Sequence, residues 1–251
     1  MENLKVEITK LNAGDKTIGE LVAADYRKAE VFRDFGMDYC CGGHKTVQQV
    51  CAKKGLNAAA VEAALETVEK SPKSKQQDFN NWELAFLTDY IMNTHHKYVK
   101  NSIPMIIELS EKVASRHGDT HPETIEIAKY TKAVVKELLM HMPKEEKVLF
   151  PYIKQMVNAQ RSGTTMTRPG FGTIENPIRM MESEHVSAGS SMEKVKTLSN
   201  NYTPPPEACA SYRVLYSKLQ EFEQDLHEHI HLENNILFPK AIQLEKELFN
   251  K

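Results

Sequence analysis

The sequence predicts an all-α protein in which a small helical domain precedes an up-down four-helix bundle. Apolar residues recur at helical spacing along most of the chain, and no stretch alternates convincingly as a strand would. The helical stretches are short near the start and long from about residue 79 onward. A polar segment over residues 71–77 separates the two regions. We therefore expect a small domain over residues 1–72 and the bundle over residues 79–251.

Capping residues and glycines delimit the helices of the small domain. Thr17 and Glu20 form one capping-box pattern, and Thr46 and Gln49 form another. Asn57 opens a third helix, and a glycine ends each of the first two. The three expected helices cover residues 17–36, 46–55 and 57–70.

Four long helices account for the remainder of the chain. Pro104 interrupts the first helix and Pro143 lies inside the second, where each removes a backbone hydrogen bond. Residues 158–175 are expected to form a long loop because they are rich in glycine and polar residues. The four expected helices cover residues 81–116, 119–156, 177–198 and roughly 207–239, with a short helical tail beyond.

The composition indicates a globular protein that works with proteins or small molecules. Hydrophobic residues make up 41% of the 251 residues, charged residues make up 26%, and the formal net charge is −2. The lack of a basic excess argues against nucleic acid as a partner. No apolar run approaches the roughly 18 residues that a membrane span needs, and the polar start lacks a signal peptide's apolar core. We expect a cytoplasmic protein without a membrane partner.

One eleven-residue phrase occurs twice in the bundle. It reads H-x-x-x-E-x-x-x-L-F-P, first from His141 with Glu145 and then from His229 with Glu233. On a helix, a spacing of four places the imidazole and the carboxylate on one face. Both histidines also continue apolar stripes that face the core. Each copy therefore offers one nitrogen and one oxygen ligand to a metal inside the bundle.

Two further histidines complete a metal constellation. His96 lies on the first long helix, 45 residues before His141, and His185 lies on the third, 44 residues before His229. Four imidazoles and two carboxylates are too many for one structural zinc, which usually takes four ligands, but they suit two non-haem iron ions. We predict that each half of the bundle supplies two histidines and that the carboxylates bridge the ions. The expected ligands are His96, His141, Glu145, His185, His229 and Glu233.

Several neighbouring residues are alternatives to this set or additions to it. His95 competes with His96, and only the fit to the apolar register favours His96. Each of two glutamates either supports the ligand histidine nearest to it on its own helix or is an ordinary solvated carboxylate. Two other histidines are interpreted as surface or supporting residues. These four residues are Glu137, Glu184, His227 and His231.

The cysteines are expected to be reduced, because an adjacent pair does not suit a disulfide framework. Cys40 and Cys41 stand before two glycines. One interpretation is a reactive thiol pair or a pair that transfers iron. Lys45 or the start of the next helix would then favour the thiolate form. The other interpretation is a tight turn with two partly buried cysteines. Cys51 and Cys209 are interpreted as packing residues.

These motifs resemble those of the iron-sulfur cluster repair di-iron proteins. The resemblance rests on both phrases, on Met-Glu-Ser-Glu-His ending at His185, on Thr-Pro-Pro-Pro-Glu-Ala-Cys ending at Cys209, and on Met-Asp-Tyr-Cys-Cys-Gly-Gly starting at Met37. It covers nearly the whole chain and implies a hemerythrin-like bundle behind a cysteine-containing helical domain, with the same six di-iron ligands. The chain departs from the family mainly in the long loop over residues 158–175 and in Pro143, and neither removes a ligand.

The resemblance also implies a function. It is the restoration of iron-sulfur clusters after oxidative or nitrosative stress, with damaged iron-sulfur proteins as partners and nitric oxide or dioxygen as small ligands. A dioxygen-binding or sensing module and a di-iron nitric oxide reductase are the alternatives, so whether the protein is an enzyme stays open. An attached Cys-Cys-Gly-Gly domain has no evident use in dioxygen storage, which favours repair. For the oligomeric state, a homodimer and a monomer are both left open.

Overall fold

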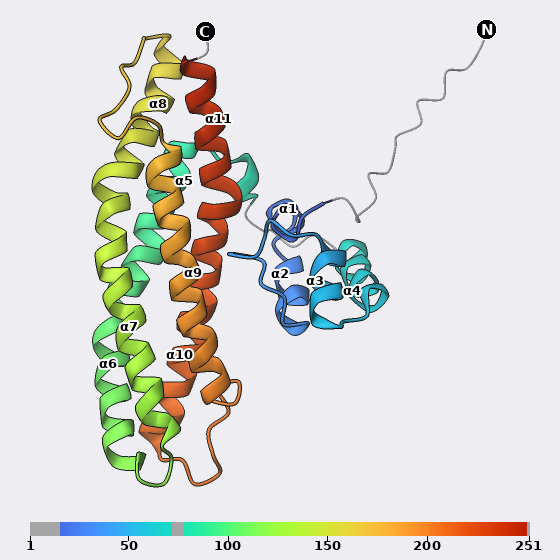
Figure 1. Ribbon diagram of the computed structural model, residues 1–251, viewed down its shortest axis with the longest axis vertical. Coiled ribbons are helices and arrows are strands. Elements are labelled where there is room, and N and C mark those ends of the chain that lie inside the picture. The colour runs from blue at the N-terminus through green and yellow to red at the C-terminus, as the bar shows by residue number, and fades with distance from the viewer. Residues whose placement is uncertain (1–15, 72–77, 250–251) are drawn as a thin grey trace, which may run out of the picture. The chain divides into compact units, whose positions relative to one another are not determined.

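A computed structural model of the chain describes residues 16–71 and 78–249 (Figure 1). Apart from one isolated bridge between Thr17 and Thr46, the regular structure of this part is helical, which confirms the all-α prediction. The chain divides into two compact units, Met1–Asp78 and Phe79–Lys251. Residues 72–77, which hold most of the expected polar linker, lie outside the described residues.

Over residues 16–71 the first unit has four short helices, one more than expected. The predicted helix over 17–36 is two helices, because Asp25 adopts an extended backbone and its carboxylate accepts hydrogen bonds from Arg27. Both capping boxes form, and Gly36 and Gly55 end their helices with φ of 62° and 67°, a conformation that favours glycine. The helices are α1 (Ile18–Ala24), α2 (Lys28–Asp34), α3 (Val47–Lys54) and α4 (Ala58–Lys70).

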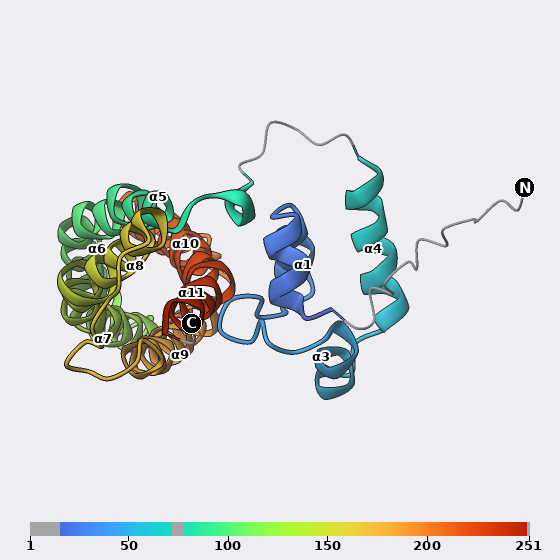
Figure 2. The same cartoon turned by 90° about the horizontal axis from the view of Figure 1, so that it is seen from above.

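The second unit is an up-down bundle, as predicted. Its long helices form a closed ring when seen from above (Figure 2). In that ring α6 packs against α7 and α10, and α9 also packs against α7 and α10. The unit begins with a 3₁₀ turn, η1 (Phe79–Asn81). The helices are α5 (Leu84–Ile91), α6 (Lys97–His117), α7 (Glu123–Lys144), α8 (Phe150–Ser162), α9 (Glu175–Leu198), α10 (Ala210–Leu232) and α11 (Phe238–Phe249).

Three wide π-helical turns interrupt the long helices. They are η2 (Met92–His96), η3 (Glu145–Leu149) and η4 (Glu233–Leu237). In η3 and η4 the N–H of Phe150 or Phe238 donates to the carbonyl five residues earlier. The proline that follows each phenylalanine has no N–H and clashes with the carbonyl four residues before it, which favours this wider pattern. Pro143 is not its cause, because the second copy of the phrase forms the same turn without an equivalent proline.

The far end of the bundle is closed by a buried carboxylate. Glu245 on α11 accepts hydrogen bonds from the Tyr152 hydroxyl, the Thr173 hydroxyl and the backbone N–H of Ile174. It therefore ties α8 and the start of α9 to α11. The second long helix also continues to Ser162, beyond the predicted end at 156, so the expected loop over 158–175 is shorter than predicted.

Apolar side chains fill the interior of the bundle on both sides of the predicted metal ligands. The leucine and phenylalanine of both phrases are almost completely buried. Among the described residues, no helix is both long and apolar enough to cross a membrane. The ligand positions therefore lie in a buried, largely apolar core that the four long helices build.

Candidate metal centre

The structure brings all six predicted ligand side chains together inside the bundle. They come from all four long helices, and each is at most 2% exposed. One histidine lies at the end of η2, and both glutamates are the first residues of π-turns. The six residues are His96, His141, Glu145, His185, His229 and Glu233.

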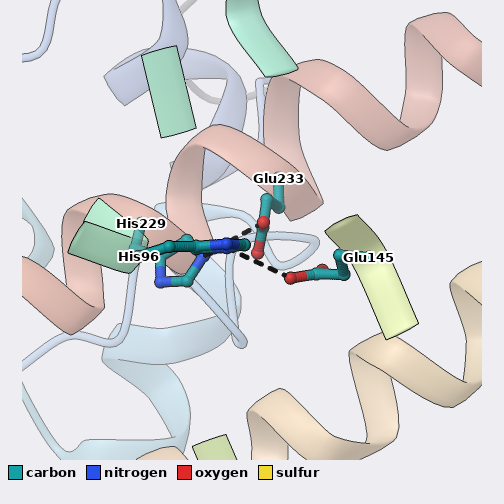
Figure 3. A group of neighbouring side chains, drawn as sticks. All are labelled: His96, Glu145, His229 and Glu233. Carbon is teal, nitrogen blue, oxygen red and sulfur yellow. Dashed lines mark hydrogen bonds and ion pairs between the residues drawn. The ribbon is translucent and has the colours of Figure 1, made fainter. Parts of the chain in front are cut away.

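The six side chains form two overlapping groups that share both carboxylates. Figure 3 shows the group in which His96 and His229 face the two glutamates. Within each group, the candidate ligand atoms all lie within 4.8 Å of one another. The Oε1 of Glu233 lies 3.0 Å from the Nε2 of His229, and its Oε2 lies 3.1 Å from the Nε2 of His185. Glu233 therefore faces one group with each oxygen, as a bridging carboxylate would.

Glu145 sits differently from Glu233. Its Oε2 lies 3.2 Å from the Nε2 of His141 and 3.4 Å from that of His96, so one oxygen faces both groups. Its Oε1 is buried and has no hydrogen-bond partner among the described residues. The two carboxylates are thus related by the repeated phrase but do not present their oxygens in the same way.

The histidines pair across the two halves of the sequence and not within them. The Nε2 atoms of His96 and His229 are 3.2 Å apart, and those of His141 and His185 are 3.1 Å apart. Each half of the bundle therefore supplies one histidine to each group. The reason is the ring of helices, in which α6 lies beside α10 and α9 lies beside α7.

Hydrogen bonds on the outer side orient three of the four imidazoles. The Nδ1 atoms of His96, His141 and His185 each lie 2.8 Å from an acceptor on another helix. An Nδ1–H that donates there leaves the lone pair of Nε2 facing inward, which is the arrangement of histidines that bind metals. The acceptors are Glu146, Glu184 and Asn234.

These donor atoms fit a bound cation. Inward lone pairs on paired Nε2 atoms, beside two carboxylates, repel one another unless positive charge lies among them. The unpartnered Oε1 of Glu145 points to the same conclusion. The donor set is nitrogen and carboxylate oxygen without cysteine, which suits non-haem iron or manganese better than a thiophilic metal.

The pKa values show how strongly the cage favours positive charge. Burial by itself lowers the pKa of His141, but the adjacent Glu145 carboxylate outweighs burial and raises the pKa to about 9. Burial by itself raises the pKa of Glu233, but His229 and His185 outweigh it and hold this pKa well below its ordinary value. Without a metal, proton binding at His141 is therefore favoured, and a metal must displace that proton on binding.

The phenylalanines of the two phrases form part of the cage wall. The Phe150 ring stacks on His96 with 5.8 Å between ring centroids, and the Phe238 ring stacks on His185 at 6.1 Å. Each phrase thus supplies a histidine, a glutamate and an aromatic wall for a histidine on another helix. This explains why the spacing extends beyond the ligands to L-F-P.

The supporting residues differ from the expected ones. Glu184 supports His141 on the neighbouring helix and not His185 beside it, while Glu137 accepts a hydrogen bond from Ser187. Sequence reasoning missed Glu146 and Asn234, although each directly follows the glutamate of its phrase. The repeat itself was the signal, because both copies place a hydrogen-bond acceptor at this position.

Two of the alternative histidines are buried. His95 is 2% exposed, and its Nδ1 lies 2.9 Å from Asp225, so it is beside the cage and not among the grouped ligands. His231 is 1% exposed and lies 3.2 Å from the amide of Asn235. Neither is therefore a surface residue, whereas His227 is half-buried.

The cysteine turn of the first unit is organised around Asp38. Its carboxylate accepts hydrogen bonds from the backbone N–H groups of Cys40, Cys41 and Gly42 and from the thiol of Cys40. A side chain at Gly42 would come within 2.9 Å of the Asp38 carbonyl, so the close approach needs glycine. The turn is held to α1 because the N–H of Gly19 donates to the carbonyl of Gly43.

The two thiols of this turn are in different surroundings. Cys40 is buried, and its hydrogen bond with Cys41, its burial and the Asp38 charge raise its pKa well above the ordinary value. The surroundings of Cys40 therefore disfavour its thiolate, because the Asp38 carboxylate lies beside the thiol. Cys41 is half-buried, which leaves it the more accessible thiol of the pair.

The remaining cysteines divide between core and surface. Cys51 is buried on α3, as expected for a packing residue. Cys209 is exposed at the start of α10, and its Sγ lies 3.3 Å from the Nε2 of His117. The packing role expected for Cys209 is therefore wrong.

The fold and the cage define a hemerythrin-type cation-binding bundle. Residues 87–241 match the family model described as Hemerythrin HHE cation binding domain, and residues 14–69 match a Domain of Unknown function (DUF542). The chain is 39% identical to the iron-sulfur cluster repair protein YtfE of Musicola paradisiaca, over 92% of this chain and 98% of that protein. It is also 39% identical to the protein of the same name from Citrobacter koseri, over 91% and 97% of the two chains. The chain belongs to the family of hemerythrin-like iron-sulfur cluster repair proteins, which confirms the resemblance seen in its motifs.

Proposed function

We propose that the bundle holds two iron ions and that the protein repairs iron-sulfur clusters damaged by oxidative or nitrosative stress. The observation that carries this proposal is the pair of four-residue groups that share Glu145 and Glu233. Two positions joined by two carboxylates are the arrangement of carboxylate-bridged di-iron proteins. The names of the relatives support the repair function. Damaged iron-sulfur proteins are the proposed partners.

Iron in the cage would supply metal to a damaged cluster and offer open coordination positions to nitric oxide or dioxygen. The protein's own residues prepare the site for it. Glu146 and Glu184 hold the outer protons of His96 and His141, so the inner nitrogens stay free to bind. Lys100 donates to Glu146, and Lys144 donates to Glu184, so each supporting carboxylate has a cationic partner on its outer side.

The outer partners also connect the cage to solvent. The side chains of Glu146 and Glu184 are 20% and 31% exposed, although the histidines that they support are buried. A change in the charge or the contacts of either exposed carboxylate would therefore act directly on the buried imidazole that it supports. We propose that they govern how readily iron is released to a client protein.

The cysteine turn has a separate proposed role. Cys41 is the more accessible thiol, and Cys40 is held protonated beside it. We propose that Cys41 makes the contact with iron or with a client cluster and that Cys40 supports the shape of the turn. Replacing Cys41 with serine should then slow reactivation of a damaged cluster enzyme, whereas equal reactivation would remove the thiol from the mechanism.

Metal analysis of anaerobically purified protein tests the cage. We expect about two iron ions per chain, and a single zinc or no bound metal would contradict the proposal. His185→Gln should lose iron, whereas His121→Gln is the matched control, because His121 lies in hydrogen bonds with Glu123 and Glu207 outside the cage. Reactivation of an oxidatively damaged cluster enzyme by the iron-loaded protein then tests repair, with His185→Gln as the inactive comparison.

A further inference from the structure

An unbroken series of aromatic rings leads from the start of the second unit to the cage. Trp82 is the only tryptophan of the chain, and its ring centroid lies 5.0 Å from that of Tyr90. Tyr90 lies 5.7 Å from His95, and His95 lies 5.6 Å from His229. The last two rings are almost parallel, with an interplanar angle of 7°. We call these three residues, Trp82, Tyr90 and His95, the ring path.

The ring path runs from solvent to the buried core. Trp82 and Tyr90 are half-buried, and Trp82 also contacts Phe86, whose side chain is 55% exposed. At the inner end, His95 and His229 are almost completely buried. Neighbouring rings at these spacings are in aromatic contact. The cage is thus linked to the protein surface through aromatic side chains.

The position of His95 departs from the internal symmetry of the bundle. In one half of the chain, Glu184 precedes His185 and supports His141. The matching residue in the other half is His95, which precedes His96 and stacks on His229. The imidazole ring of His95 therefore occupies the position at which the other half of the chain has the carboxylate of Glu184, which supports a ligand histidine.

The Nδ1 atoms of His95 and His229 show that His95 does not support His229 as Glu184 supports His141. The Nδ1 of His95 lies 2.9 Å from Asp225, which fixes the ring orientation. The Nδ1 of His229 is buried and has no hydrogen-bond partner within the described part of the chain. The contact that His95 makes with His229 is therefore a ring contact and not a hydrogen bond that supports a ligand.

The other rings that touch the cage do not form such a path. Phe150 stacks on His96 and Phe238 stacks on His185, but phenylalanine is hard to oxidise and both rings are buried. Tyr212 and Tyr216 contact each other at 4.8 Å, but among the described residues their ring contacts lead to His117 and His121 and not to the cage. Tryptophan and tyrosine, the two side chains that most readily give up one electron, are joined to a candidate ligand on the ring path.

We propose that the ring path carries electrons from Trp82 to the cage and so moves oxidising equivalents away from the metal ligands to the protein surface. This inference rests on the iron binding of the proposed function. The oxidant is a peroxide that reaches iron in the cage. The path would protect the ligand histidines, whose oxidation would destroy the site.

Reduction of hydrogen peroxide to two waters takes two electrons and two protons. When ferrous iron gives one electron, Trp82 gives the other through Tyr90 and His95, and the indole also releases its N–H proton. The second proton comes from solvent, and the ferrous iron becomes ferric. A cellular thiol then returns a hydrogen atom to the neutral Trp82 radical and becomes a thiyl radical.

Electron paramagnetic resonance on frozen samples tests the path. The protein is loaded with ferrous iron without oxygen, its iron content is measured, and it is frozen soon after a limiting amount of hydrogen peroxide is added. We expect an organic radical whose spectrum changes when the protein contains ring-deuterated tryptophan, which labels Trp82 alone. Iron-free protein mixed with the same peroxide should give no such signal.

Variants identify the route. Trp82→Phe should abolish the tryptophan signal, and peptide mass spectrometry should show several-fold more oxidation of the cage histidines. Tyr90→Phe keeps a ring but removes the phenol, and it should lower the Trp82 signal several-fold. Tyr216→Phe is the matched control and should change neither readout, because Tyr216 has no ring contact with the path.

The outcomes separate this inference from the proposed function. Protein that holds iron but gives no Trp82 radical, or gives equal radical in the Tyr90→Phe and Tyr216→Phe variants, overturns the ring path and leaves iron binding intact. Protein that holds no iron overturns the proposed function as well. Thermal unfolding and the iron content of each variant show whether a lost signal reflects a lost fold.

Discussion

In the cage, Glu145 and Glu233 face imidazole nitrogens that arrive from all four long helices, whereas in the cysteine turn Asp38 faces the backbone of its own loop. Both regions bring carboxylates together with residues that bind metals. They differ in how many hydrogen bonds the carboxylate oxygens accept from the protein. Asp38 accepts three backbone N–H groups and a thiol, whereas Glu145 keeps a buried oxygen without a hydrogen-bond partner among the described residues.

This difference leaves the cage with more unengaged donor atoms for a cation than the turn has. Three imidazoles of the cage have their outer nitrogens occupied by acceptors, which leaves the inner nitrogens for a metal. In the turn, Cys40 keeps its proton beside the Asp38 carboxylate, although a metal ligand would have to lose it. The turn also gathers possible ligand atoms, because those of Asp38, Cys40 and Cys41 lie within 4.8 Å of one another, but its carboxylate already accepts three backbone N–H groups.

The largest expected effect follows from removing a shared carboxylate. Glu233→Gln keeps the size of the side chain but removes the charge that faces His185 and His229. We expect the iron content to fall from about two per chain to about one or less. Metal analysis after anaerobic loading measures it, with Glu193→Gln on the surface of α9 as the control. Unchanged iron content would show that Glu233 is not a bridge.

A smaller effect is expected from the outer partner of one histidine. Glu184→Gln keeps an acceptor near the Nδ1 of His141 but removes its charge. We expect iron affinity to fall by about 10–100-fold, as is common for residues that support metal ligands. A competition assay with a chelator measures the affinity. Glu182→Gln on the same helix is the control, and an equal loss in both variants would contradict a specific role for Glu184.

In the cysteine turn, Asp38→Asn should affect the thiol more than the fold. Loss of the carboxylate charge removes one cause of the raised pKa of Cys40, so its alkylation should begin at lower pH. We expect a stability cost of about 1 kcal/mol from weaker backbone hydrogen bonds. Mass spectrometry of alkylated peptides across pH measures the change. Asp34→Asn, at the exposed end of α2, should leave the pH profile of Cys40 unchanged, and an unchanged profile in Asp38→Asn would contradict this account.

The smallest effect is expected at a buried carboxylate outside the cage. Burial raises the pKa of Glu223 above its ordinary value of 4.5, and Lys196 offsets this only in part. The folded protein therefore binds this proton more tightly than the unfolded chain does. The contribution of Glu223 to stability is complete below pH 4.5 and is lost as pH rises through the folded-state pKa.

Glu223→Gln stays neutral at every pH, so it should raise Tm slightly near pH 7 and change it little near pH 4.5. Thermal unfolding of metal-free protein at both values measures this difference. Glu221→Gln, which removes the exposed partner of Lys218, is the control. A Tm difference that does not vary with pH would show that burial of the Glu223 charge is not its cause.

Much of the fold could be predicted because its signals are local. Capping boxes at Thr17 and Thr46, glycines with positive φ and helical periodicity all act within a few residues of one another. The break at Asp25 was missed because its cause is an interaction between the side chains of Asp25 and Arg27, which periodicity does not reveal. The π-turns were missed for a similar reason, since apolar spacing hardly changes when one turn widens.

By itself, the sequence determined which six side chains meet in the bundle. Their spacing places each of them on the buried face of its helix, and burial in an apolar core leaves polar groups no favourable alternative to one another. The tertiary structure alone decided how they pair, because the order of helices around the ring sets His96 beside His229 and His141 beside His185. It also decided that His95 presents a ring to His229 while Asp38 holds Cys40 protonated, since both depend on the direction in which a side chain points.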